Sequence, residues 1–104
     1  VVARAQQLGV ARLALKALAY SKLPSPEGPR PFAKCWYQPV SDPQLASLAL
    51  RFALSQPITA AVPPGEAPLF RLAVDIARNY TPITDDEVAQ LRRLAADAEP
   101  FFTL

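Results

Sequence analysis

The expected fold of this chain rests on one stretch, Leu48-Ala-Leu-Arg-Phe-Ala-Leu-Ser-Gln-Pro-Ile-Thr-Ala-Ala-Val-Pro-Pro-Gly65. It contains, in order, the end of an apolar helix, a very short turn, a buried strand at Ile58–Val62 and a Pro-Pro-Gly turn, and a second amphipathic helix follows at once. Helix, strand, turn and helix at this spacing are typical of α/β folds with parallel strands. The turn after such a strand is also where these folds bind ligands.

The first part of the chain predicts the strand that would pair with Ile58–Val62. Residues 1–8 read as the end of a helix, and Gly9 stops it. We interpret Val10–Leu18 as a strand, because Gly9 interrupts the helical pattern and a loop rich in helix breakers follows. Alanine and leucine favour helix, so a helix that continues through Val10–Leu18 stays open as the alternative. In that case the fold would be a small, mostly α-helical bundle.

A long proline-rich loop is predicted over residues 19–41. Its prolines and Gly28 oppose regular structure through most of its length. A loop this long inside a compact domain is either functional or disordered. Several side chains that favour burial argue against complete disorder, so we expect the second half of the loop to pack onto the body. These side chains are Phe32, Cys35, Trp36 and Tyr37.

Three helices are predicted in the second half of the chain. The first begins after Asp42, a good N-cap, at Pro43, which suits the first helical position. The second runs from about Pro68 to Asn79, and the third begins with the capping box Thr84-Asp-Asp-Glu87. The helical spacing predicts that the first helix turns Leu45, Leu48, Ala49 and Phe52 toward the core.

The composition restricts the class of protein. With 104 residues, of which 51% are hydrophobic, the chain makes at most one domain with a packed core. Its scattered basic residues and net charge of +2 do not favour nucleic acid as a partner. No apolar run approaches the roughly 20 residues of a membrane span, so no membrane partner is expected. The single cysteine, Cys35, fits a reducing cytoplasm, and the absence of histidine excludes a Cys/His zinc site within the chain.

Several motifs resemble, in their order and spacing, the C-terminal part of the aldo-keto reductase superfamily. Members usually read Ala-Leu-Arg-Trp, a short strand, Ile-Pro-Gly and a helix, where this chain has Ala49-Leu-Arg-Phe52, Pro64-Gly65 and Leu69-Phe-Arg-Leu-Ala-Val-Asp75. Lys16-Ala-Leu-Ala19 stands where many members have Ser-Pro-Leu-Ala or Lys-Pro-Leu-Ala. The resemblance implies a partial (β/α)8 barrel. Residues 1–104 would supply its last two parallel strands, their flanking helices and a C-terminal helix, in a fold that needs roughly 250 residues.

The resemblance also implies part of an NADPH site at the carboxyl ends of these strands. Gly65 would let the backbone turn sharply near a phosphate, and the helix after it would point free N–H groups at an anion. Arg71 falls where the family often has a glutamine near the adenosine 2′-phosphate, and its guanidinium would bind that phosphate bidentately. The alternative for Arg71 is a surface ion pair with Asp75, four residues on.

Four more residues belong to the same predicted site. Lys16 would reach a pyrophosphate from the end of the first strand, although such a lysine is often only a solvated residue. Leu18 would lie under the dinucleotide. Asp75 falls where the family often has an asparagine against the adenine, and it keeps an acceptor for an amino group. Glu66 departs from the pattern, because its negative charge beside a phosphate is unfavourable.

The family's catalytic Asp, Tyr, Lys and His lie upstream of this region, so no catalytic residue is assigned and the isolated chain is expected to be inactive. The resemblance implies a fragment of an NADPH-dependent oxidoreductase whose parent reduces aldehydes or ketones. The alternative is a non-catalytic binding or structural module that has lost the cofactor site. A two-stranded parallel sheet leaves open edges and an apolar face, so we expect pairing with the rest of the barrel or self-association.

Overall fold

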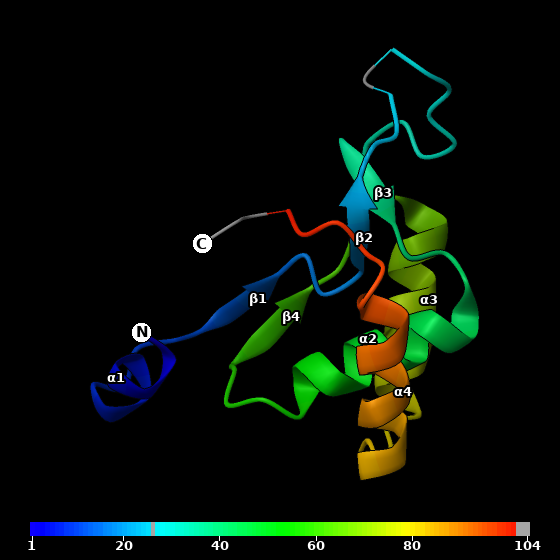
Figure 1. Ribbon diagram of the computed structural model, residues 1–104. Coiled ribbons are helices and arrows are strands. Elements are labelled where there is room, and N and C mark those ends of the chain that lie inside the picture. Colours follow the sequence, from blue (N-terminus) through cyan, green and yellow to red (C-terminus); the bar gives the residue numbers. More distant parts are fainter. Residues whose placement is uncertain (26, 102–104) are drawn as a thin grey trace.

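The computed structural model describes residues 1–25 and 27–101 and has the predicted α/β class (Figure 1). Two short sheets, one parallel and one antiparallel, combine with the last three helices, which gather on one side of the parallel pair, while the first helix stands apart (Figure 1). In chain order the elements within the described residues are α1 (Val2–Gln7), β1 (Leu13–Leu15), β2 (Ala19–Lys22), β3 (Tyr37–Pro39), α2 (Pro43–Leu54), β4 (Ala60–Val62), α3 (Ala67–Arg78) and α4 (Asp85–Ala95).

The parallel pairing of β1 with β4 confirms that the two predicted strands lie side by side and run in the same direction. Leu13 faces Ala60 and Leu15 faces Val62 across the pair. The amino end of the pair is closed by Arg12, whose carbonyl accepts a 2.7 Å hydrogen bond from the Thr59 N–H and whose own N–H donates to the Thr59 Oγ1 at 2.9 Å. The helical alternative for this region, and with it the small α-helical bundle, is therefore wrong.

Strand β1 is shorter than the predicted span of Val10–Leu18. It ends because Lys16 has φ +66°, which lies in the left-handed region and cannot continue an extended strand. The carbonyl of Lys16 then accepts a 3.0 Å hydrogen bond from the Ala19 N–H, and this turn leads directly into β2. One residue with an unusual backbone angle thus divides the predicted strand into β1 and a turn.

The predicted loop over residues 19–41 contains an antiparallel hairpin that the sequence analysis missed. Its strands β2 and β3 pair Ala19 with Pro39 and Lys22 with Tyr37, with an irregularity between Ala19 and Ser21. The prolines that argued against regular structure lie mostly between the two strands, and Pro39 stands at the last position of β3. The expected packing of the second half is confirmed, because Cys35 and Tyr37 are buried.

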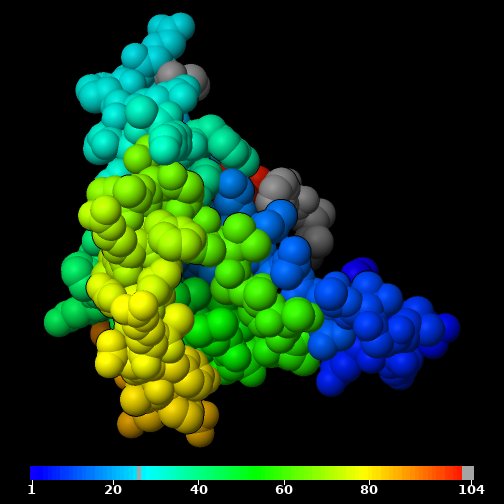
Figure 2. Space-filling model, turned by 180° about the vertical axis from the view of Figure 1, so that it is seen from behind, coloured from blue at the N-terminus to red at the C-terminus, as the bar shows by residue number. Residues whose placement is uncertain are grey.

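The first helix, α1, ends at Gln7, and Gly9 stops it as predicted. Gly9 has φ +66°, its N–H donates to the Gln6 carbonyl, and the Val10 N–H reaches back to the Ala5 carbonyl at 2.9 Å. These two bonds form a Schellman motif, which favours glycine because other residues are strained at this angle. Helix α1 has no buried residue, and the N-terminal segment projects from the body (Figure 2).

The main core lies where α2 and α3 pack against the strands. Asp42 caps α2 as predicted, since its Oδ1 accepts a 2.8 Å hydrogen bond from the Leu45 N–H. The prediction that Phe52 faces the core is wrong, because its side chain is 38% exposed. The core side of α2 is centred on Ala46 and Leu50, which leaves Phe52 outside it. The buried cluster consists of Leu18, Val40, Ala46, Leu50 and Ala73.

The parallel pair β1–β4 is covered on one face only. Ala61 packs against the core beneath the helices, whereas Leu13, Leu15 and Val62 remain exposed. Parallel sheets are normally covered on both faces, so this apolar face is a surface without a partner within the described chain. In the same residues, no helix combines the length and apolar character needed to cross a bilayer.

Candidate functional site

The parallel topology brings several predicted site residues to one edge of the β1–β4 pair. Lys16 directly follows β1, while Gly65 and Glu66 come between β4 and α3. Because the carboxyl ends of parallel strands meet at the same edge, the two turns lie together there. Both turns also contact the segment 34–37, which runs into β3. This edge is the candidate site.

Lys16 is held against aromatic rings at this edge. Its Nζ lies 3.9 Å from the ring centroid of Tyr37 and 4.3 Å from that of Trp36. Phe101, from the segment after α4, meets both rings edge to face, with centroids 6.0 Å from Tyr37 and 5.9 Å from Trp36. The two distances from the Lys16 ammonium are within the range of cation–π attraction. We call Trp36, Tyr37 and Phe101 the aromatic cluster.

The ammonium of Lys16 makes no hydrogen bond and no ion pair with any residue that the structure describes. Among those residues, every fully buried side-chain nitrogen or oxygen has a hydrogen-bond partner. Since the Lys16 ammonium has no such partner, it is not fully buried, and solvent reaches it. Lys16 therefore keeps its donors available for an acceptor from outside. The prediction that it contacts a pyrophosphate stays a prediction, and any such contact would have to compete with the two rings.

Tyr37 has a low capacity for acid–base chemistry in this position. Burial raises its pKa to about 12, and the neighbouring Cys35 thiol adds to the shift through charge repulsion and a side-chain hydrogen bond. The phenol is therefore protonated throughout the physiological range, far from the pKa near neutrality that suits a general acid. Tyr37 serves this site as a neutral ring face for Lys16 and as a buried anchor for β3.

Glu66 connects the start of α3 to the segment before β3. It occupies the N-cap position of α3 without a side-chain cap bond, and its Oε1 instead accepts a hydrogen bond from the backbone N–H of Lys34. The carboxylate thus has a structural role at the edge where the sequence predicted a phosphate. Its negative charge would oppose an anion there.

The other predicted residues differ in how accessible they are. Leu18 is 1% exposed in the main core, so its side chain has almost no surface left for a dinucleotide. A Cβ on Gly65 would meet no atom within 4 Å, and its φ lies outside the left-handed region, so this turn does not itself require glycine. Arg71 and Asp75 are exposed on α3, and these two described residues do not form the ion pair considered as the alternative.

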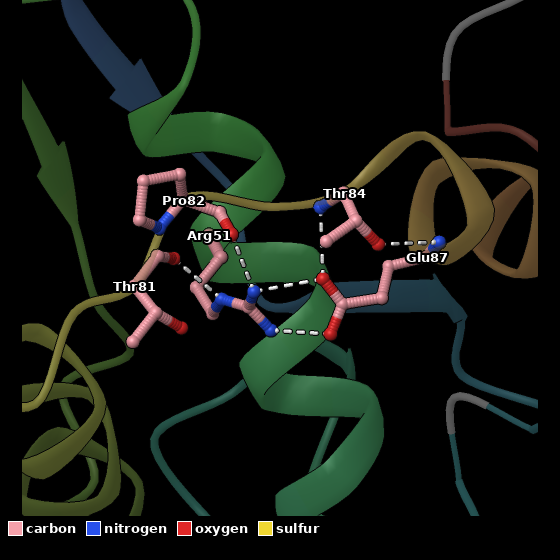
Figure 3. A network of polar contacts seen from close by, with 5 residues as sticks. All are labelled: Arg51, Thr81, Pro82, Thr84 and Glu87. Carbon is pink, nitrogen blue, oxygen red and sulfur yellow. Dashed lines mark hydrogen bonds and ion pairs between the residues drawn. The ribbon is translucent and has the colours of Figure 1, made fainter.

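A polar network that sequence reasoning missed lies elsewhere, around Arg51 on α2 (Figure 3). Arg51 on α2 forms a bidentate pair with Glu87 on α4, in which Nη1 and Nη2 each donate at 2.8 Å. Arg51 also donates from Nε to the Thr81 carbonyl at 2.7 Å and from Nη2 to the Pro82 carbonyl at 2.8 Å. The network therefore joins α2, the turn before α4 and the first turn of α4.

The charges in this network are well matched. The hydrogen bonds from Arg51 lower the pKa of Glu87 to about 2, with help from the backbone N–H of Thr84, and Glu87 in turn raises the pKa of Arg51. Glu87 also completes the predicted capping box, since its Oε2 accepts from the Thr84 N–H at 2.9 Å. A sequence signal existed: an arginine within an apolar helix requires a partner, and arginine is rarely buried alone.

Two hollows are lined mostly by other residues, although Tyr37 also borders the first of them. One, of about 280 Å³, is formed by the proline-rich segment around Pro24, Pro29 and Phe32. The other, of about 240 Å³, is lined only by apolar residues of α2, β4 and α3, among them Leu54 and Phe70. Neither contains a predicted site residue. Among the residues described, no group of three or more His, Cys, Asp or Glu side chains is arranged to hold a metal ion.

Comparisons of the chain with protein-family models, with curated proteins and with solved structures found no match.

Proposed function

We propose that this chain is the closing part of a (β/α)8 barrel that reduces aldehydes or ketones with NADPH, and that it carries the part of the site that receives the adenosine end of the cofactor. One observation carries the proposal: β1 and β4 are adjacent and parallel, helices cover one face, and the other face exposes Leu13, Leu15 and Val62. Strands of a barrel expose such a face when they are separated from their neighbours.

The accessible residues of α3 fit the adenosine end of NADPH. Arg71 is exposed and not paired with Asp75, so its planar guanidinium is available to bind a 2′-phosphate bidentately. Asp75 lies one turn further along α3, where its carboxylate would accept from the adenine amino group. The open space around Gly65 would allow a phosphate to approach the backbone, and the first N–H groups of α3 favour an anion.

In this proposal NADPH supplies the hydride, and this part of the protein binds and orients the cofactor. The catalytic acid and the carbonyl substrate belong to the remainder of the barrel, which would cover the exposed face of β1 and β4. The single, buried Cys35 agrees with a reducing compartment such as the cytoplasm.

The test compares two small ligands that differ by one group. Adenosine 2′,5′-bisphosphate should bind about tenfold more tightly than adenosine 5′-monophosphate, because a hydrogen bond to a charged group is worth about 1.5–3 kcal/mol. Binding is followed by NMR shifts of the α3 amides. Arg71→Ala should remove the preference, whereas Arg78→Ala, a matched change at the other end of α3, should keep it. Equal affinity for the two ligands would contradict the proposal.

A second candidate is a non-catalytic binding or structural module that keeps the βα arrangement without a cofactor. The Glu66 carboxylate at the start of α3 favours it, because this group opposes a phosphate at the point where the α3 N–H groups would attract one. Under this candidate neither adenosine ligand nor NADPH shifts the α3 amides, and Arg71→Ala changes nothing. The same titration therefore separates the two functions.

A further inference from the structure

The contact between Lys16 and the aromatic cluster joins three segments that are distant in the chain. Lys16 directly follows β1, Trp36 and Tyr37 lie at the start of β3, and Phe101 follows α4. Figure 1 shows the segment after α4 returning across the carboxyl end of the strands. A second, exposed contact holds the same segment, since the Lys22 ammonium lies 3.6 Å from the Glu99 carboxylate.

We propose that Lys16 is an anion-released latch. While its ammonium lies on the rings, Lys16 holds the 34–37 segment and the segment after α4 (residues 96–101) over the edge of the β1–β4 pair. A phosphate group bound at this edge draws the ammonium away from the rings and loosens both segments. The proposal rests on the proposed function in one respect, namely that the ligand at this edge carries phosphate. It adds a regulatory role for the aromatic cluster, which the cofactor prediction did not use.

The latch is able to open because its closed form leaves Lys16 incompletely satisfied. A non-glycine residue at φ +66° is strained, so the backbone gains little from this arrangement on its own. The ammonium has no hydrogen-bond acceptor or carboxylate among the described residues, and solvent reaches it. Charge-assisted hydrogen bonds to phosphate are stronger than attraction to a ring face, so an anion competes successfully.

Thermodynamic linkage fixes the direction in which anion affinity changes when the ring contact of Lys16 is weakened. Because the rings and the anion compete for one ammonium, weakening the ring contact should strengthen anion binding by up to the same factor. Phe101 packs against both rings without being a ligand for the anion in this scheme. Phe101→Ala should therefore bind inorganic pyrophosphate more tightly than the unaltered chain, by up to roughly 2- to 12-fold for an aromatic contact of this kind. A merely structural role for Phe101 predicts weaker binding or none.

The emission of Trp36 reports the latch directly, because it is the only tryptophan in the chain and it is 58% exposed. Lys16→Gln should shift the emission and increase quenching by acrylamide in the absence of any ligand. Lys34→Gln is the matched control, because among the described residues Lys34 makes its hydrogen bond through its backbone N–H and not through its ammonium. Lys16→Arg should restore the original spectrum, because a guanidinium also stacks on aromatic faces. Circular dichroism checks that each variant is folded.

Pyrophosphate is then added to the unaltered chain, with sodium chloride at equal ionic strength as the control for screening. A saturable change toward the Lys16→Gln spectrum, absent in Lys16→Gln itself, supports the latch. If Lys16→Gln leaves the ligand-free spectrum unchanged, there is no latch, whatever the cofactor does. If pyrophosphate leaves the spectrum unchanged, release by an anion is refuted. A pyrophosphate response without preference for the 2′-phosphate at Arg71 would keep the latch and reject the NADPH site.

Discussion

The helices α2, α3 and α4, which we call the helical layer, differ from the β1–β4 pair in how much of their inner surface this chain buries. In the helical layer Leu50 is 4% exposed, and the Arg51 side chain, 11% exposed, donates hydrogen bonds to two carbonyls and a carboxylate. On the strand pair Leu15 is 69% exposed, and the neighbouring α1 buries nothing. Two parallel strands with one bare apolar face form half of an interface. The difference predicts that truncations in the helical core and on the strand face have unequal effects.

The largest expected difference in stability is between a leucine truncated in the helical layer and a leucine truncated on the exposed strand face. Leu50→Ala removes a side chain from the main core and should lower the free energy of unfolding by about 2–5 kcal/mol. Leu15→Ala removes a similar side chain from the bare face and should change it by less than about 0.5 kcal/mol. Urea unfolding of both variants at low protein concentration measures the contrast. A comparable loss in Leu15→Ala would show that the strand face is covered in solution.

The second effect concerns association. The bare apolar face and the open strand edges should cause this chain to self-associate as its concentration rises. The double variant Leu13→Lys, Leu15→Lys places charges on that face and should return the chain to a monomer. Leu94→Lys is the matched control, because Leu94 is an exposed leucine on α4, away from the strand pair. Light scattering after gel filtration decides, and an unaltered chain that stays monomeric at high concentration would refute the expectation.

A smaller, pH-dependent effect should distinguish the helical layer. The pKa of Glu87 is about 2 in the folded chain, below its ordinary value of 4.5, so its contribution is present above about pH 4.5 and is lost as the pH falls toward 2. Arg51→Met removes the main cause of the shift. The variant should therefore be less stable near neutral pH, and the difference from the unaltered chain should shrink between pH 4.5 and 2.

Thermal unfolding at several pH values measures this difference. Glu87→Gln, which removes the same charge from the other side of the pair, should show the same trend. A difference that stays constant down to pH 2 would mean that the ion pair contributes nothing, and that only the bonds of Arg51 to the Thr81 and Pro82 carbonyls matter.

Local chemistry made much of the fold predictable. Gly9 and Asp42 each act within a few residues through backbone bonds, and the structure confirms both. The short uncharged strand at Ala60–Val62 was also recognisable, because its pattern differs from the helices around it. The hairpin of β2 and β3 was not, because its strands are separated by a proline-rich segment whose composition dominated the interpretation of residues 19–41.

The site was less predictable because it depends on contacts across the chain. Sequence alone placed Lys16 at a strand end, but the ring faces of Trp36 and Tyr37 come from more than one element away. Arg51 was recognised in the Ala49–Phe52 motif and Glu87 in the capping box, but no local sequence pattern predicted that the two side chains form an ion pair. Topology brought the predicted turns to one edge, and tertiary packing decided which side chains remained accessible there.

The smallest effect on stability should come from Gly65→Ala, and it tests the strand side most directly. The added Cβ meets no atom of this chain and the φ of Gly65 is not left-handed, so the free energy of unfolding should change by less than about 0.5 kcal/mol. A phosphate that approaches the backbone at this turn would, however, collide with the new methyl group. Unchanged stability with weakened binding of adenosine 2′,5′-bisphosphate would therefore locate a ligand at this edge, whereas unchanged binding would mean that Gly65 is only part of a turn.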